Sequence, residues 1–435
     1  GMAYISPDLT RKAIVTALSN QYESGEMPDG ILLSKDATLK YINQVPHTDQ
    51  CVWLPITILA YLDETNDSAL LTCQVPFKNS DETASISEHL LLAVNWLIKH
   101  RDKRGLCYIN QGDWCDPMNM VGPEGKGVSA WLSMATVYAI DCLLQINQYY
   151  LSQQHTPISL KDNEYLNEIR DELVNATNKH CWDGQWYARG ITDNGDSFGI
   201  SDDEEGRIYL NPQSWSLLSG IASTAKRFSI LNEVEKQLNT PFGMMMLAPS
   251  YTQMREDIGR ITQKYPGVAE NGSVYNHAAI FYAYGLYQIG EANQAFQVLR
   301  KMLPTDADML IRGQMPTFIP NYYRGAYYQL PDTAGRSSHL MNTGTVAWFY
   351  RCIIEELCGL KGRAGELFIN PQLPDSINSL AGSRYYLQAN FNFTIRKVAV
   401  NEIKLTLDGS AIAGNRISTI TAGQTYQLDI QVPKA

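Results

Sequence analysis

The period of the apolar residues changes once along the chain, and this change constrains the fold more than any other feature. From Pro7 to about Gly362, apolar residues recur every three or four positions in segments broken by Gly, Pro, Asn and Asp. That spacing is typical of one face of a helix. After Glu366 the period becomes two, as in half-buried strands. Helices followed by strands predict two sequential domains rather than one mixed sheet.

The clearest predicted helix follows Ser85. Glu88, three residues later, completes a capping box, the apolar run HLLLAVNWLI follows, and Gly105 closes the segment. The same spacing predicts further helices over residues 8–20, 127–153, 161–179, 212–224, 273–289, 292–302 and 343–358. Short connections alternate with long ones, so we expect antiparallel helix pairs whose long loops share one functional end.

The strand-rich part alternates apolar and polar residues over 391–396, 403–408 and 426–432, with a turn signal at Asp408-Gly409. We therefore expect a mainly α fold in which a helical domain over residues 1–364 is followed by a small antiparallel β-sandwich over residues 365–435.

Charge and composition exclude some classes of partner. The 435 residues carry a formal net charge of −10, and their Lys and Arg are scattered rather than gathered into a stripe, so no nucleic acid is expected. Apolar runs are shorter than the roughly 20 residues that span a bilayer, and no leader peptide is recognisable, so we expect no membrane association and a cytoplasmic location. The eight cysteines contain no C-x-x-C pair, which predicts buried, reduced thiols.

The stretch GDWCDPMN places Asp113 and Asp116 three residues apart around Trp114. Asp and Asn are common in turns because they bond their own backbone, and that reading suffices for this stretch alone. The alternative is an active-site loop, in which burial beside an indole would raise the pKa of Asp116 and keep a transferable proton on it. One motif leaves both readings open.

Two further loops place polar groups at the start of a predicted helix. PGVAENGSVYNHA brings Glu270, Tyr275 and His277 together, and NTGTVAW brings Thr343 and Gly344 to a helix start. Free backbone N–H groups there can bind an anion, although a core histidine and a plain N-cap are the commoner explanations. PNYYRG and YLNPQSW combine aromatic and amide groups that suit a sugar ring, and chance clustering is the alternative. No metal-binding or nucleotide-binding motif is recognisable.

Taken in order, these loops resemble the inverting disaccharide phosphorylases of glycoside hydrolase family 94, such as the cellobiose and chitobiose phosphorylases. The resemblance covers nearly the whole chain and rests on HTDQCVWLP, GDWCD, WDGQWYARG, IYLNPQSW, PGVAENGSVYNHA, PNYYRG, TGTVAWFYR and INPQLP. It implies an (α/α)6 barrel followed by a β-sandwich.

The resemblance also implies residue roles. Asp116 matches the general acid, and His277, Thr343 and Gly344 match phosphate ligands. The positions that match the sugar subsites are Trp114, Asp49, Trp53, Arg189, Gln213, Glu270, Tyr275 and Arg324. Because inorganic phosphate is the nucleophile, no catalytic base and no cofactor are expected beyond phosphate as co-substrate.

Departures from the family pattern define the alternatives. The family's G-x-R-D-x-x-Q-D segment and N-terminal β-sandwich would precede residue 1, so we expect either part of a longer protein or a shortened homologue that lacks the first barrel helix. Besides its substrates, the chain would then bind either a second copy of itself or the N-terminal β-sandwich. Single residues that differ from the family pattern are Gln50, Cys115, Pro117 and Val128. The rival functions are an inverting hydrolase with Glu270 as its second carboxylate, and a catalytically impaired sugar-binding protein.

Overall fold

The computed structural model describes residues 2–31, 47–154, 157–315, 317–338 and 344–434. Its helices are α1 (Met2–Ile5), α2 (Pro7–Leu18), α3 (Gln50–Thr65), α4 (Ile86–Lys99), α5 (Ala130–Ile146), α6 (Leu160–His180), α7 (Leu210–Leu218), α8 (Thr224–Leu238), α9 (Asn276–Gln288), α10 (Ala292–Met302), α11 (Met309–Arg312) and α12 (Thr345–Arg351). Shorter helical turns are η1 (Ser68–Thr72), η3 (Arg260–Gln263) and η4 (Pro331–Thr333), and α5 and α12 continue as the π-helical turns η2 (Asn147–Leu151) and η5 (Cys352–Leu357).

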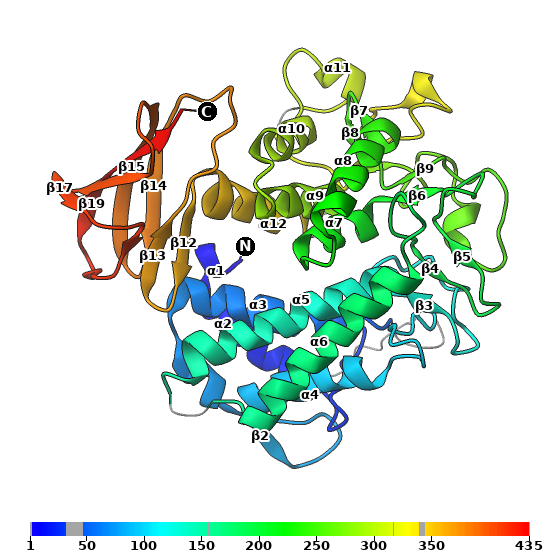
Figure 1. The fold of residues 1–435 in the computed structure, drawn as a ribbon, viewed down its shortest axis with the longest axis horizontal. Helices are drawn as coiled ribbons and strands as arrows, with labels where there is room; N and C mark the ends of the chain where they lie inside the picture. Colours follow the sequence, from blue (N-terminus) through cyan, green and yellow to red (C-terminus); the bar gives the residue numbers. More distant parts are fainter. Residues whose placement is uncertain (1, 32–46, 155–156, 316, 339–343, 435) are drawn as a thin grey trace.

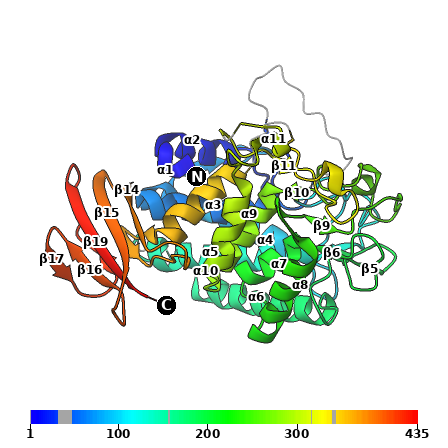
Figure 2. The ribbon, with the colours of Figure 1, turned by 90° about the horizontal axis from the view of Figure 1, so that it is seen from above.

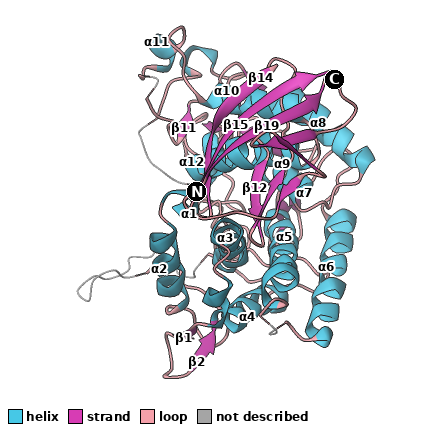
Figure 3. Ribbon diagram, turned by 90° about the vertical axis from the view of Figure 1, so that its left-hand side faces the viewer, coloured by secondary structure: helices cyan, strands magenta, loops and turns pink. Residues whose placement is uncertain are grey.

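The helices form an inner and an outer layer. α3, α5, α7, α9 and α12 contact one another in that order, while α4, α6, α8 and α10 pack against them from outside. α7 and α9 bury nearly every residue, whereas α6 and α8 bury a single face. A helix that is apolar all round belongs in an interior, and an amphipathic one at a surface. Figure 3 shows α2, α3, α5 and α6 side by side, and α6 lies on the outside.

Short strands organise the loops of the helical part: β1 (Gln74–Pro76), β2 (Thr83–Ser85), β3 (Val128–Ser129), β4 (Gly190–Ile191), β5 (Ser197–Phe198), β6 (Ile208–Tyr209), β7 (Asn239–Thr240), β8 (Gly243–Met244), β9 (Leu247–Ala248), β10 (Val274–Tyr275) and β11 (Tyr322–Tyr323). β3 pairs with β4, β4 with β5, β6 with β9 and β10 with β11, all antiparallel. In Figures 1 and 2, β5, β6 and β9 lie on the side of the helices away from the C-terminal strands. The long loops therefore gather at one side of the helical part.

The strand-rich part contains two sheets built from β12 (Leu360–Arg363), β13 (Glu366–Ile369), β14 (Ser379–Tyr386), β15 (Ala389–Val398), β16 (Lys404–Leu407), β17 (Ser410–Ile412), β18 (Arg416–Ile417) and β19 (Thr425–Pro433). One sheet has the order β12-β13-β18 and the other β14-β15-β19-β16-β17. The predicted division after residue 364 falls inside the β12–β13 hairpin.

The prediction of a wholly antiparallel arrangement is wrong for one pair of strands. β15 and β19 run parallel, from Asn390 opposite Thr425 to Val398 opposite Pro433. The period of two in the sequence reports which side chains share a face, and it carries no information on the direction of the neighbouring strand. The remaining pairs in the two sheets are antiparallel.

The predicted helices are confirmed with shifted ends, and four helices, α1, α3, α8 and α11, were not predicted. The capping box at Ser85 is present, and both of its hydrogen bonds with Glu88 are formed. α3 was missed because apolar residues cover most of its faces and Pro55 lies inside it. α8 was missed because only Ile230, Val234 and Leu238 are buried in an otherwise polar helix. The segment predicted over 212–224 instead ends at Leu218.

All eight cysteines are unpaired thiols, and all but the half-buried Cys73 are buried. The predicted reduced, buried thiols are therefore confirmed at every position except that one. Within the described part of the chain, no helix is long and apolar enough to cross a bilayer.

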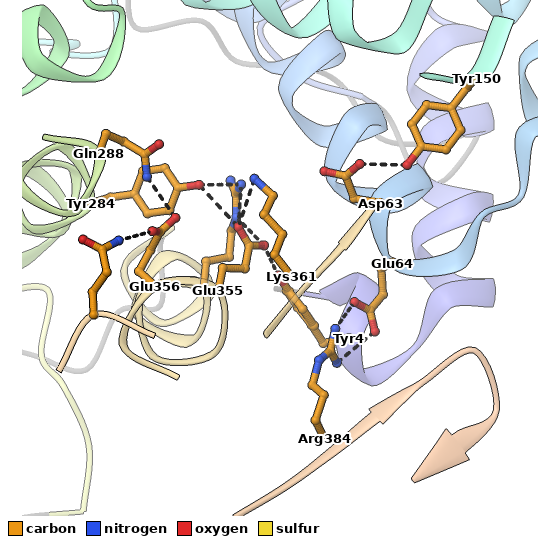
Figure 4. A network of polar contacts seen from close by, with 12 residues as sticks. Tyr4, Asp63, Glu64, Tyr150, Tyr284, Gln288, Glu355, Glu356, Lys361 and Arg384 are labelled. Carbon is orange, nitrogen blue, oxygen red and sulfur yellow. Dashed lines mark hydrogen bonds and ion pairs between the residues drawn. The ribbon is translucent and has the colours of Figure 1, made fainter. Parts of the chain in front are cut away.

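A buried polar network joins the helical and strand-rich parts (Figure 4). Glu64 at the end of α3 forms an ion pair with Arg384 on β14, and the two side chains are only 9% and 2% exposed. Tyr4 on α1 donates a hydrogen bond to Glu355 in η5, which also accepts one from Arg351 Nε at 3.2 Å. Charged groups thus hold the larger sheet against the helices, and each needs its partner because water is excluded.

We expect Glu64→Ala to destabilise the fold by about 3–5 kcal/mol, because Arg384 would remain buried without a counter-charge. A matched control is Arg396→Ala, whose ion pair with Asp429 is about half exposed, 53% and 51%, and whose loss should cost less than about 1 kcal/mol. Urea unfolding followed by circular dichroism measures both. Equal losses in the two variants would contradict the role given to the interface.

Candidate active site

The loop over residues 112–119 is anchored by a buried ion pair. Asp113 is fully buried and accepts two hydrogen bonds from Arg189 Nη2, at 2.6 Å to Oδ1 and 2.8 Å to Oδ2. Ser129 Oγ donates to Asp113 Oδ2 at 2.6 Å and accepts from Arg189 Nη1 at 3.1 Å. The backbone N–H of Cys115 donates to Asp113 Oδ1 at 3.0 Å. A buried charge with this many partners fixes the backbone on which Trp114 and Asp116 are carried.

Local structure brings the partners of this ion pair together. Arg189 directly precedes β4, which pairs with β3, and β3 ends at Ser129, the N-cap residue of α5. The Ser129 hydroxyl accepts from the Leu132 backbone N–H at 2.9 Å, as an N-cap does. A Cβ on Gly190 would lie 2.4 Å from the carbonyl oxygen of Val128, so only glycine permits this approach of the two strands.

The surroundings of the Asp116 side chain differ from those of Asp113. Its side chain is 65% exposed, His47 Nε2 lies 3.9 Å from its Oδ1, and Arg260 Nη2 donates to its backbone oxygen at 3.2 Å. Loss of surrounding water raises the pKa of Asp116, the charge of His47 lowers it and that of Glu270 raises it. The net pKa is raised, so Asp116 keeps its proton to a higher pH than an ordinary aspartate.

Trp114 brings the acidic loop into contact with the start of α9. Its ring lies edge-on to Tyr275, His277 and Phe281, with ring centroids 5.8, 5.1 and 5.9 Å away. Burial lowers the pKa of His277 to about 3. The imidazole is therefore neutral near pH 7, with one ring nitrogen as a donor and the other as an acceptor.

The start of α12 lies against the same imidazole. Gly344, the N-cap residue of α12, is so close that an added Cβ would lie 2.3 Å from His277 Nε2. Any larger side chain there would displace a ring that is already packed on Trp114 and Phe281. Thr343, which was predicted as a phosphate ligand, lies outside the described residues. Of the predicted phosphate group, the structure brings His277 and Gly344 together.

Glu270 and Tyr275 lie in the segment that leads into α9. Glu270 forms an ion pair with Lys264 and is 17% exposed, and its charge acts on both Asp116 and Tyr275. The Tyr275 ring stacks on Tyr322 across the β10–β11 pair, with centroids 6.3 Å apart. Arg324, a predicted sugar ligand, follows β11 directly and is half-buried. The β10–β11 pair thus holds several predicted sugar ligands near one another.

Asp49 and Trp53 stand at the start of α3. The buried Asp49 accepts a hydrogen bond from Trp53 Nε1 at 2.9 Å. The pKa of Asp49 is raised to about 7, mainly because the carboxyl group is buried. The Trp53 hydrogen bond lowers this pKa, and the charge of Asp113 raises it further. The Trp53 ring stacks on Phe281 at 6.1 Å. Phe281 therefore connects this pair to the ring cluster of Trp114.

Arg189 and Gln213, predicted at or near the sugar subsites, lie inside the wall of the site. Both side chains are fully buried. Gln213 accepts from the Tyr187 backbone N–H at 3.0 Å and donates to the Tyr187 oxygen at 2.8 Å, while Arg189 binds Asp113. The Gln213 amide and the two Nη atoms of Arg189 bind protein partners, so these side chains support the neighbouring loops.

Two residues next to Asp116 were not predicted. His47 is the first residue of HTDQCVWLP, one of the stretches that carried the resemblance, and this was the available signal. Arg260 lies in the short turn η3, where no motif marks it, and only tertiary structure brings it to Asp116 across 144 residues. Among the residues described, no three His, Cys, Asp or Glu side chains are placed to hold a metal ion.

We expect the His277 imidazole to remain neutral from about pH 8 down to about pH 5, because burial disfavours its charged form. Its ring resonances in NMR spectra should keep one position over this range, and His277→Asn identifies them. Trp114→Ala, which admits water to the ring, should raise the pKa. A His277 signal that shifts between about pH 7 and pH 6 in the unaltered protein would contradict the assignment.

Comparison with solved structures concerns the fold alone. A family 78 rhamnosidase of Bacillus sp. GL1 superimposes with a TM-score of 0.56 at 13% identity, covering 90% of this chain and 37% of that one. A family 63 mannosylglycerate hydrolase from Thermus thermophilus gives 0.52 at 13% identity, covering 80% of this chain and 91% of that one. The similarity supports a shared helical architecture.

Sequence matches identify the family to which this chain belongs. Residues 1–359 match the catalytic domain of the glycosyl hydrolase 94 superfamily. The cellobionic acid phosphorylase of Neurospora crassa is 51% identical over 100% of this chain and 54% of its own length. The 3-O-beta-D-glucopyranosyl-beta-D-glucuronide phosphorylase of Paenibacillus borealis is 36% identical over 99% of this chain and 55% of its own length. The chain thus spans about half the length of these relatives, and it belongs to the glycosyl hydrolase 94 superfamily.

Proposed function

We propose that this chain contains the catalytic part of a glycoside phosphorylase. In this reaction, inorganic phosphate splits a β-linked, glucose-type disaccharide or oligosaccharide and produces an α-sugar 1-phosphate with inversion. The observation that carries the proposal is the position of Trp114, which stands two residues before Asp116 and packs against His277. The loop that carries the proton donor thereby contacts the hydrogen-bonding imidazole through one indole.

Asp116 acts as the general acid. Its raised pKa favours the protonated form that must donate to the glycosidic oxygen as the bond breaks. Phosphate attacks the anomeric carbon from the opposite face through an oxocarbenium-like state, so inversion needs one carboxylic acid and no protein base. Its partly exposed side chain is accessible to a substrate, whereas the buried Asp113 is confined to its ion pair.

His277 and Gly344 form the phosphate side of the site, together with Thr343 from the predicted group. The neutral imidazole supplies a hydrogen bond rather than a fixed positive charge. A bound phosphate dianion would favour the protonated imidazole and so strengthen its own binding. The close approach of the Gly344 backbone to His277 supports this role, because it brings the start of α12 to the ring.

The sugar is held by the aromatic and polar groups around this centre. Trp114, Trp53 and Tyr275 offer rings, and Asp49 and Arg324 offer hydrogen-bonding groups, while the buried Arg189 and Gln213 keep the wall in place. For the fold, we propose that α3, α5, α7, α9 and α12 belong to the inner ring of an (α/α)6 barrel. Their successive contacts support it.

An inverting hydrolase on the same scaffold would need a second carboxylate that deprotonates water, and Glu270 is the candidate. Glu270 forms an ion pair with Lys264. This contact engages the carboxylate with a neighbouring side chain rather than leaving it to a water molecule, which favours phosphorolysis over hydrolysis. The third alternative, a sugar-binding protein without activity, is separated from both by a direct assay.

We expect sugar 1-phosphate to form when the protein is incubated with phosphate and a panel of β-linked glucosyl disaccharides. Asp116→Asn should lower kcat by about 10²- to 10⁴-fold, because an amide cannot give up the proton. Asp429→Asn, an exposed aspartate on β19, is the matched control and should leave kcat unchanged. Product formation that does not depend on phosphate would support the hydrolase, and no product from any member would contradict the phosphorylase.

We further propose that the leaving sugar carries a carboxylate. Asp116 protonates the oxygen that departs with this sugar, so the groups around Asp116 line its subsite. His47 and Arg260 contact Asp116, and Lys264 lies four residues after Arg260. These cations suit an acidic sugar, and both curated relatives described above are named for substrates that contain one, a cellobionic acid and a glucuronide.

Replacing Arg260 with Gln tests the preference for a leaving sugar that carries a carboxylate. A hydrogen bond to a charged group contributes about 1.5–3 kcal/mol, so kcat/KM for an acidic disaccharide should fall about 10- to 100-fold. Activity on the corresponding neutral disaccharide should change little. Arg416→Gln on β18 is the matched control, because its side chain is 59% exposed. An equal loss of kcat/KM on both substrates would show that Arg260 supports the loop and does not select an acidic leaving sugar.

A further inference from the structure

His47 lies between two carboxylates. Its Nδ1 is 3.5 Å from Asp29 Oδ1, and its Nε2 is 3.9 Å from Asp116 Oδ1. Asp29 is itself held in place, because its Oδ1 accepts hydrogen bonds from the His47 backbone N–H at 2.7 Å and from Gln50 Nε2 at 2.5 Å. This arrangement orients the ring so that one nitrogen faces Asp29 and the other faces Asp116.

The charges around His47 favour its protonated form. Burial alone would lower the pKa of His47, but the Asp29 hydrogen bond and the charges of Asp116, Asp29 and Asp49 raise it above its ordinary value. These three carboxylates come from three separate segments, and Glu270 adds a further negative charge that acts on Asp116. An imidazolium at this position has a proton to give near neutral pH.

Asp116 requires such a source of protons. After it protonates the leaving oxygen, it remains as a carboxylate, and it must recover a proton before the next cleavage. While sugars occupy the pocket, they would cover the exposed 65% of the Asp116 side chain, whereas the His47 side chain is 17% exposed and approaches Asp116 from the protein side. The gap of 3.9 Å can be bridged by a small rotation of the carboxylate or by one water molecule.

We propose that His47 is a proton relay that returns a proton from solvent to Asp116 after each cleavage, an inference that rests on the proposed phosphorylase function. The N–H bond at Nε2 breaks and an O–H bond forms at Asp116 Oδ1, which leaves a neutral imidazole and a neutral carboxylic acid. The imidazole then takes one proton from solvent. Hydrogen phosphate releases one proton as it becomes the sugar phosphate dianion, so the cycle consumes none.

Chemical rescue tests the relay. In His47→Ala, kcat for phosphorolysis of a neutral disaccharide should fall about 10- to 100-fold while KM for that disaccharide stays within about threefold, because the relay acts on proton return and not on binding. Added imidazole should occupy the space left by the ring and restore part of kcat with saturation. His47→Gln fills that space without a transferable proton, so imidazole should restore nothing. The backbone hydrogen bond to Asp29 survives in both variants.

An unchanged kcat in His47→Ala, or a loss that imidazole cannot restore, overturns the relay even when the unaltered protein is active. If the unaltered protein makes no sugar 1-phosphate, the proposed function has failed, and the relay falls with it. A separate measurement needs no turnover: Asp116→Asn should lower the pKa of His47 seen by NMR, because it removes a neighbouring negative charge. An unshifted His47 titration would show that the two groups are not coupled.

Discussion

The buried ion pair between Arg189 and Asp113 determines where every other part of the candidate site lies. Its charges have no contact with water, so the cost of burial has to be offset by the bidentate hydrogen bonds and by Ser129. Those bonds tie the loop over residues 112–119 to the start of α5 and to β4. With the loop fixed, Trp114 packs on the rings at the start of α9, and the Asp116 side chain remains 65% exposed.

Exposure to water, more than residue type, sets the ionisation state of the groups around this loop. Burial raises the pKa of Asp49 to about 7 and lowers that of His277 to about 3, so both favour their uncharged forms. His47 is shifted the other way, because three carboxylates offset the effect of its burial. The site therefore combines a cation beside Asp116 with a neutral hydrogen-bonding ring that packs on Trp114, an asymmetry that suits a proton donor and an anion at one site.

Local signals predicted the regular elements well. The capping box at Ser85 forms as expected, and α10 spans the predicted residues 292–302. Prediction failed where burial was uniform or sparse: α3 is apolar on most faces, and α8 buries only three residues. It also failed for β15 and β19, whose alternation is correct but whose parallel pairing joins segments separated by the β16–β18 region. Periodicity reports the local environment of each face, and pairing direction depends on the path of the chain.

The sequence by itself determined the change from helices to strands, the order of the loops and the identity of Asp116 as the candidate acid. Tertiary structure decided that Asp113 is an anchor rather than a second acid, that Arg189 and Gln213 lie within the wall, and that His47 and Arg260 flank Asp116. The physical reason is distance along the chain. Arg189 is 76 residues from Asp113 and Arg260 is 144 from Asp116, so their effects on charge and position arise only when folding brings these segments together and excludes water between them.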